Sequence, residues 1–102
     1  MKVLWTDQAF ERLAEIEAYV ARDDPKAGER LEDRIIARGT ALADHPHLGR
    51  RLPELPSGDL REVIVGNYRL VYRARDDDVI VLTVFEGHRL LPAADLDAPD
   101  SD

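Results

Sequence analysis

Residues 60–89 read LREVIVGNYRLVYRARDDDVIVLTVFEGHR and carry the strongest fold signal of the chain. Apolar, β-branched and aromatic residues dominate three segments of this run, residues 60–66, 68–75 and 79–85, as is typical of β-strands. A Gly-Asn pair separates the first two segments and suits a tight turn that needs a positive φ, and three consecutive aspartates separate the last two. The run therefore predicts a three-stranded antiparallel meander.

Two amphipathic helices are expected before the meander. In the first helix Ala9, Leu13, Ile16 and Val20 recur at helical spacing. The second helix is expected to begin at the Asp24-Pro25 pair, because aspartate caps a helix N-terminus and proline fits the first helical position. With few residues between them, the helices should form an antiparallel hairpin behind a short strand at residues 2–5. The predicted fold class is α+β.

Length and composition place the chain among single globular domains. At 102 residues, 44% hydrophobic and 34% charged, one core suffices, and we expect a domain over residues 1–92 and an acidic, disordered tail over residues 93–102. The chain has no cysteine, which excludes disulfides and a thiolate nucleophile. No apolar run approaches the roughly 18 residues of a membrane span, so we expect a cytoplasmic protein without a membrane partner.

The net charge of −7 argues against a general nucleic-acid binder, whose affinity depends on cations that neutralise phosphates. The acids are unevenly distributed, however. Residues 50–92 hold seven arginines and seven acids, and three of these acids are bunched in the aspartate turn. A local cationic face on the sheet is therefore compatible with an acidic protein.

Arginines recur along the predicted strands. In the segment 68–75, Arg69 and Arg73 share one face by the two-residue period of a strand, and Arg61 on the preceding strand is expected to lie near them. Arginine forks bind phosphate bidentately, so one interpretation is a phosphate clamp. The other is a solvated face on which these arginines pair across strands with Glu62 or Asp78.

His88 and Arg89 end the last predicted strand. Histidine titrates near neutral pH and can act as a general acid or base in phosphodiester cleavage. If the chain is a nuclease, the catalytic candidates are His88, Arg61, Arg69 and Arg89, working without a metal. The alternative is a histidine hydrogen-bonded to the backbone at a strand end.

Two other clusters invite a site and are assigned none. Asp44, His45 and His47 offer too few ligands in a proline-containing loop, so we predict no metal and no cofactor. A row of arginines at helical spacing in the second helix could touch nucleic acid, but pairing with glutamates of the first helix is favoured. The row is Arg30, Arg34 and Arg38, and the glutamates are Glu11, Glu15 and Glu17.

The order of elements and five short motifs resemble the RelE/ParE superfamily of toxins from type II toxin–antitoxin systems. The motifs are Ala9…Leu13…Ile16…Tyr19-Val20, Leu42…Pro46…Gly49-Arg50…Pro53-Glu54-Leu55, Leu60-Arg61-Glu62, Tyr68-Arg69-Leu70-Val71-Tyr72 and Val84-Phe85-Glu86-Gly87-His88-Arg89. Together they span roughly residues 3–92. The resemblance implies a compact α+β domain that a cognate antitoxin binds and neutralises. The net charge further predicts basic residues in the bound antitoxin segment.

The resemblance leaves three functions open. RelE-like members cut mRNA on the ribosome, and Arg61 and His88 match positions that such nucleases use, while Arg69 matches a family arginine on the central strand. ParE-like members inhibit DNA gyrase and lack that catalytic set. The absence of lysine after Lys26, and Arg89 where many nucleases place tyrosine, favour the ParE branch. The third reading is a non-toxic remnant that only binds its antitoxin.

Overall fold

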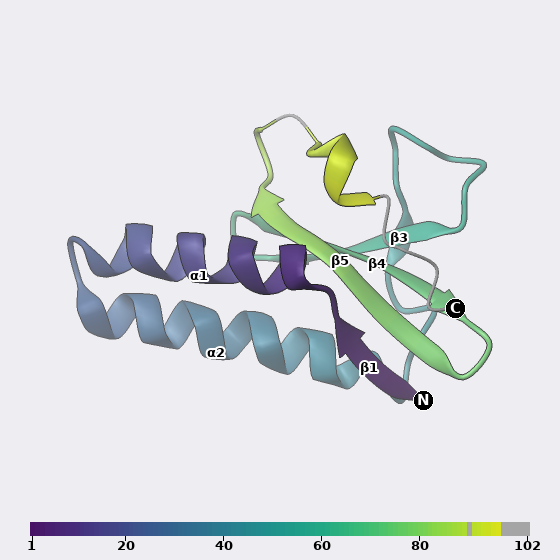
Figure 1. Ribbon diagram of the computed structural model, residues 1–102, viewed down its shortest axis with the longest axis horizontal. Helices are drawn as coiled ribbons and strands as arrows, with labels where there is room; N and C mark the ends of the chain where they lie inside the picture. Colours follow the sequence, from purple (N-terminus) through teal and green to yellow (C-terminus); the bar gives the residue numbers. More distant parts are fainter. Residues whose placement is uncertain (90, 97–102) are drawn as a thin grey trace.

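The computed structural model describes residues 1–89 and 91–96. A short strand, a helical hairpin and four further strands follow one another, ending in a 3-10 turn (Figure 1). The elements are β1 (Lys2–Trp5), α1 (Asp7–Ala21), α2 (Pro25–Ala41), β2 (Arg50–Arg51), β3 (Leu60–Val65), β4 (Tyr68–Arg75), β5 (Asp78–Glu86) and η1 (Ala93–Leu96). The predicted α+β class, helical hairpin and meander are confirmed, and strand β2 is an addition.

Local chemistry accounts for the helix starts and the hairpin turn. The Thr6 hydroxyl accepts a hydrogen bond from the backbone N–H of Ala9, and the Asp24 carboxylate accepts one from that of Ala27. Both bonds satisfy donors that a helix N-terminus leaves unpaired. Gly66 has φ +60°, the left-handed conformation in which glycine carries no steric penalty, and it turns β3 into β4.

The five strands form one sheet in the order β1-β5-β4-β3-β2. Strands β3, β4 and β5 pair antiparallel, whereas β1 pairs parallel with β5, so that Leu4 lies opposite Ile80. Strand β2 pairs through two residues, with Arg50 opposite Glu62. A two-residue strand has no periodicity to read, which is why the sequence did not reveal it.

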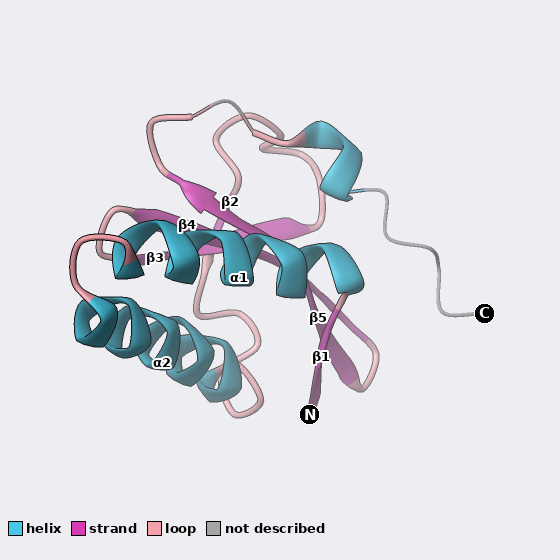
Figure 2. Ribbon diagram, turned by 60° about the vertical axis from the view of Figure 1, so that its left-hand side comes forward, coloured by secondary structure: helices cyan, strands magenta, loops and turns pink. Residues whose placement is uncertain are grey.

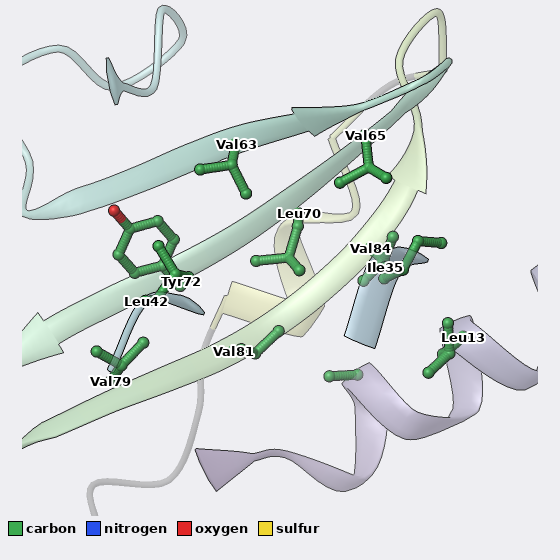
Figure 3. Close-up of a cluster of buried hydrophobic side chains, with 11 residues drawn as sticks. Leu13, Ile35, Leu42, Val63, Val65, Leu70, Tyr72, Val79, Val81 and Val84 are labelled. Atoms are coloured by element: carbon green, nitrogen blue, oxygen red, sulfur yellow. The ribbon is translucent and has the colours of Figure 1, made fainter. Parts of the chain in front are cut away.

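The two helices lie side by side against one face of the sheet (Figure 2). The core between them is built from strand residues such as Leu70, Tyr72 and Val81 and from helix residues such as Leu13 and Ile35 (Figure 3). Leu70 and Tyr72 have no exposed surface and belong to this core. Burying such side chains supplies about 1.5–3 kcal/mol each, and this core accounts for the hairpin's position. Within residues 1–89 and 91–96, no helix combines the length and apolar character of a membrane span.

A second, smaller cluster covers the opposite face of the sheet. Leu52, Leu60, Val71, Leu82 and Phe85 are buried there. Leu91 and Leu96, from the end of the described chain, pack against them. Both faces of the central strands are therefore shielded from water over part of their length.

Segment Ala93–Leu96 corrects the expectation of a disordered tail from residue 93 onward. It forms the 3-10 turn η1, and Asp95 is 5% exposed. The Asp95 carboxylate accepts hydrogen bonds from Arg12 Nε at 2.7 Å and from Thr83 Oγ1 at 2.9 Å. These contacts, with Leu96 in the second cluster, offset the entropy of ordering four residues. Residues 97–102 lie outside the described part.

Replacing Asp95 with asparagine is expected to remove a pH dependence of stability. Burial opposes the ionisation of Asp95, but the hydrogen bonds from Arg12 and Thr83 hold its pKa below the ordinary 3.8. A lowered folded-state pKa contributes stability that is present above the unfolded pKa and is lost as the pH falls through the folded value. Urea unfolding of the wild type from about pH 5 downward should show this loss, and Asp95→Asn should lack that part. Equal pH slopes for both proteins would contradict the assignment.

Candidate functional site

Arg69 is the centre of an ion-pair network on the sheet face away from the helices. It projects from β4 beside Phe85, with its guanidinium carbon 4.9 Å from the ring centroid. Its Nε donates to Glu62 Oε1 at 2.5 Å, and its two terminal nitrogens donate to Glu54 at 2.8 and 2.7 Å. Arg50 Nε donates to the other oxygen of Glu62 at 2.7 Å.

The carboxylates neutralise Arg69 almost completely. The Glu62 side chain is fully buried, whereas that of Glu54 is 40% exposed. Hydrogen bonding to Glu54 and Glu62 raises the pKa of Arg69 further above its already high value, and the bond from Arg69 lowers the pKa of Glu54. A phosphate would have to displace a bidentate carboxylate to reach this guanidinium.

Arg73 is paired as well. Its Nε lies 3.3 Å from Asp59 Oδ2, and its side chain is 17% exposed. Of the two readings of the arginine face, cross-strand pairing is confirmed for Arg69 with Glu62. The acid paired with Arg73 is Asp59, not the expected Asp78. The face is consequently a network of arginines and acids in close pairs.

Arg61 does not join Arg69. In the β3–β4 register it lies opposite Tyr72, a member of the helix-facing core, while Arg69 lies opposite Ile64. Residues 61 and 64 are three apart, so their side chains leave the strand on opposite faces. Arg61 Nη1 donates to the carbonyl oxygen of Gly49 at 2.8 Å. The expectation that Arg61 neighbours Arg69 and Arg73 is therefore wrong.

Both backbone polar groups of Gly49 are hydrogen-bonded to side chains of the sheet. Its N–H donates to the Tyr72 hydroxyl at 2.8 Å while its carbonyl accepts from Arg61. Burial raises the pKa of Tyr72, so the hydroxyl stays protonated at neutral pH. Arg61 and Tyr72 thus anchor the loop that leads into β2.

His88 lies at the exposed rim of a depression of about 340 Å3 beyond the end of β5. The turn residues Gly66 and Asn67 form one wall, and Pro53 with Glu54 forms another. The backbone N–H of His88 donates to Glu86 Oε1 at 2.9 Å. Arg69 also lines the depression, so His88 and Arg69 are brought to one hollow.

Arg89 faces a different hollow. It lines a groove of about 600 Å3 between α1 and the end of β5, together with Ile16, Tyr19, Tyr68 and Phe85. Tyr19 is 67% exposed although it is aromatic. The groove combines apolar walls with charged margins, which is the composition of a peptide-binding surface. The four nuclease candidates are thus divided among two hollows and the opposite sheet face.

The two other clusters singled out in the sequence are the loop with Asp44, His45 and His47 and the arginine row of α2. In residues 1–89 and 91–96, no group of three or more histidines and acids is arranged to hold a metal ion. The expected pairing of the α2 arginines with α1 glutamates is wrong, since no ion pair of the described residues joins them; Glu15 pairs with Arg12 instead.

Sequence reasoning missed Glu54 and Gly49 as members of the site. Glu54 was noted as part of a motif, but it lies 15 residues before Arg69, in a loop whose course the periodicity does not predict. Gly49 likewise appeared only as part of that motif, with no partner assigned to it. The available signal was the presence of Glu62 inside a mainly apolar strand, since a buried carboxylate requires a cationic partner.

A helical hairpin packed on one face of a five-stranded sheet is a small α+β fold that solved toxin structures share. A solved structure of the chromosomal ParDE toxin–antitoxin system from P. aeruginosa is similar, with a TM-score of 0.71 and 20% identity over 84% of this chain and 95% of that chain. A mutant of the E. coli toxin RelE in the free state is similar with a TM-score of 0.61 and 16% identity, over 85% and 83% of the two chains. At these identities the likeness shows the fold.

Sequence relatives give the family. The chain matches the family described as ParE toxin of type II toxin-antitoxin system, parDE, over residues 3–91. It is also 37% identical over 95 residues to a protein of Sinorhizobium fredii (strain NBRC 101917 / NGR234) named "Putative toxin Y4kP", covering 89% of this chain and 93% of that protein. The chain belongs to the ParE toxin family, which confirms the superfamily and the branch favoured by its sequence.

Proposed function

We propose that this toxin inhibits DNA gyrase and thereby blocks replication, and that a cognate antitoxin neutralises it. The observation that supports this proposal most strongly is the state of the arginines. A metal-independent nuclease needs unpaired cations around one scissile phosphate, together with an acid and a base. Here the Arg69 guanidinium is already hydrogen-bonded to two carboxylates, and Arg61 lies on the other face of the sheet.

Antitoxin binding is supported by the groove between α1 and β5. Its apolar residues Ile16, Tyr19 and Phe85 would receive the apolar side of a helical or extended segment. A bound segment would also shield the exposed ring of Tyr19 from water. The proposed complex is heteromeric, with a segment of the antitoxin in this groove.

The test is gyrase supercoiling with the purified toxin. We expect complete inhibition at micromolar toxin, recovery when the antitoxin is added, and unchanged inhibition by His88→Ala, because no reacting group is needed in this mechanism. In cells expressing the toxin without antitoxin, thymidine incorporation should fall before methionine incorporation.

Two results would overturn the gyrase proposal. Untouched supercoiling combined with early loss of methionine incorporation, abolished by His88→Ala, would identify a ribosome-dependent mRNA nuclease. Untouched supercoiling with normal growth and intact antitoxin binding would identify a non-toxic remnant. A folded His88→Ala protein, verified by circular dichroism, makes the comparison valid.

A further inference from the structure

Three arginines form a line along one flank of α2. Arg30, Arg34 and Arg38 are exposed and recur every four residues, a rise of about 6 Å each along the helix axis. Like charges at this spacing repel and destabilise a helix. Among the described residues none of the three has an ion-pair partner, although the chain carries 21 acids. We call them the arginine stripe.

The stripe lies on the side of α2 away from α1. Gly28 marks the side toward α1, because a Cβ there would lie 2.9 Å from the Glu17 carbonyl oxygen and the Ala21 Cβ. Counting about 100° per residue, Arg34 and Arg38 lie about 240° and 280° around the helix from Gly28. This position removes them from the α1 glutamates and explains the missing pairs.

Charge is segregated around α2. The acids Glu29, Glu32 and Asp33 lie about 40–140° from Gly28 by the same count, on the opposite flank from the stripe. Neither Arg34 nor Arg38 has an acid three or four residues away on the helix. Arg34 extends instead toward the β3–β4 turn, where its Nη2 lies 3.8 Å from the position of a Cβ on Gly66. The arrangement presents one charge sign in one direction.

We propose that the arginine stripe docks an acidic helical segment of the antitoxin. Carboxylates at every fourth position of a helix recur at the same rise of about 6 Å as the three guanidinium groups, so the two rows can pair in register. Arginine suits such pairing because its fork binds a carboxylate bidentately. The segment is acidic, which reverses locally the basic partner expected from the net charge of −7.

A protein partner fits the stripe better than a nucleic acid does. The stripe consists of arginines and includes no aromatic side chain on which a base could stack. The net charge of −7 would also repel a long polyanion. A short acidic helix contacts the stripe while leaving the acidic flank of α2 uncovered. The identification of the acidic partner as the antitoxin rests on the proposed function, but binding of an acidic helix to the stripe can be tested without it.

The test uses a fluorescent alanine–glutamine helical peptide with glutamate at every fourth position. In about 50 mM salt, where surface pairs are weakly screened, we expect the wild type to bind it and Arg34→Glu/Arg38→Glu to bind it about tenfold more weakly. The control Lys2→Glu/Arg22→Glu carries the same charge change at exposed positions off the stripe and should stay within about twofold of the wild type. Arg34→Gln/Arg38→Gln, a milder change, should weaken binding in the same direction and serves if the reversal variant fails to fold.

Three results would overturn the inference. They are no binding by the folded wild type, equal loss in the stripe and control variants, and tighter, stripe-dependent binding of a single-stranded DNA of matched charge. Gyrase supercoiling is measured with the same variants. Unchanged supercoiling inhibition with lost peptide binding separates the stripe from the toxic surface, so either proposal can fail without the other.

Discussion

Replacing Arg69 with methionine is expected to lower the free energy of unfolding by about 3–5 kcal/mol. The change leaves the fully buried Glu62 carboxylate with Arg50 alone, whose side chain is 65% exposed. A buried carboxylate that loses its less exposed cationic partner costs more than the pair contributes, because its desolvation is no longer fully offset. Methionine keeps an unbranched apolar side chain against Phe85, so the lowered free energy of unfolding reflects the lost charge more than lost packing. Equilibrium urea unfolding followed by circular dichroism measures it.

Two matched variants sharpen this prediction. Arg69→Met/Glu62→Leu should recover most of the lost stability, since it leaves no buried charge, and apolar replacement of a buried pair is often neutral. Arg73→Met breaks the pair with Asp59, whose side chain is 57% exposed, and should cost about 1 kcal/mol or less. If Arg73→Met costs as much as Arg69→Met, the network is not the origin of the effect.

Replacing Gly49 with alanine is expected to destabilise the protein by about 2–4 kcal/mol, through overpacking and two disturbed hydrogen bonds. An added Cβ would lie 2.5 Å from the Glu62 carbonyl oxygen and 2.8 Å from the Tyr72 ring. The carbonyl belongs to β3 and the ring is buried, so neither can move without loosening the loop anchored by Arg61. Denaturant unfolding and hydrogen exchange at the amide of residue 49 measure the change.

Gly58→Ala is the control for the Gly49 prediction. A Cβ at Gly58 would meet its nearest atoms, both of Leu55, at 3.4 and 3.8 Å, which is ordinary contact. This substitution should change stability by less than about 1 kcal/mol and can be stabilising, since alanine reduces the entropy of the unfolded chain. Similar losses at both glycines would refute the steric argument.

The two stability predictions bear on the proposed function. Arg69 matches a family arginine on the central strand and is one of the four nuclease candidates, yet here it stabilises a buried carboxylate. Loss of toxicity in Arg69→Met alone would therefore be ambiguous. Toxicity of the restored Arg69→Met/Glu62→Leu protein would show that the guanidinium is dispensable for action, as expected of a gyrase inhibitor.

Local features of the chain were predictable because their causes are local. The caps at Thr6 and Asp24 and the positive φ of Gly66 depend on residues within three or four positions. The alternation that put Arg69 and Arg73 on one strand face and Tyr72 on the other depends on backbone geometry alone. Such signals do not depend on distant residues, so the structure reproduces them.

Pairings between distant residues were not predictable in the same way. Arg61 was placed with Arg69, but a register set by the β3–β4 turn puts it on the other face. The tail was assigned to disorder from its polarity, yet Asp95 lies 83 residues from Arg12 in the chain and contacts it directly. The composition of a segment does not reveal a contact with residues that are distant in sequence and that only folding brings close.

The α+β class, the helical hairpin, the meander and membership of the toxin family could be predicted from residue order, because periodicity, caps and turn residues act locally and the motifs are short. Three features depend instead on contacts between distant parts of the chain: β1 adds parallel to β5, Glu54 and Glu62 pair with Arg69, and the α2 arginines face away from the acids expected to pair with them. Charge pairing depends on distance and burial in space, and neither quantity is set by position along the chain.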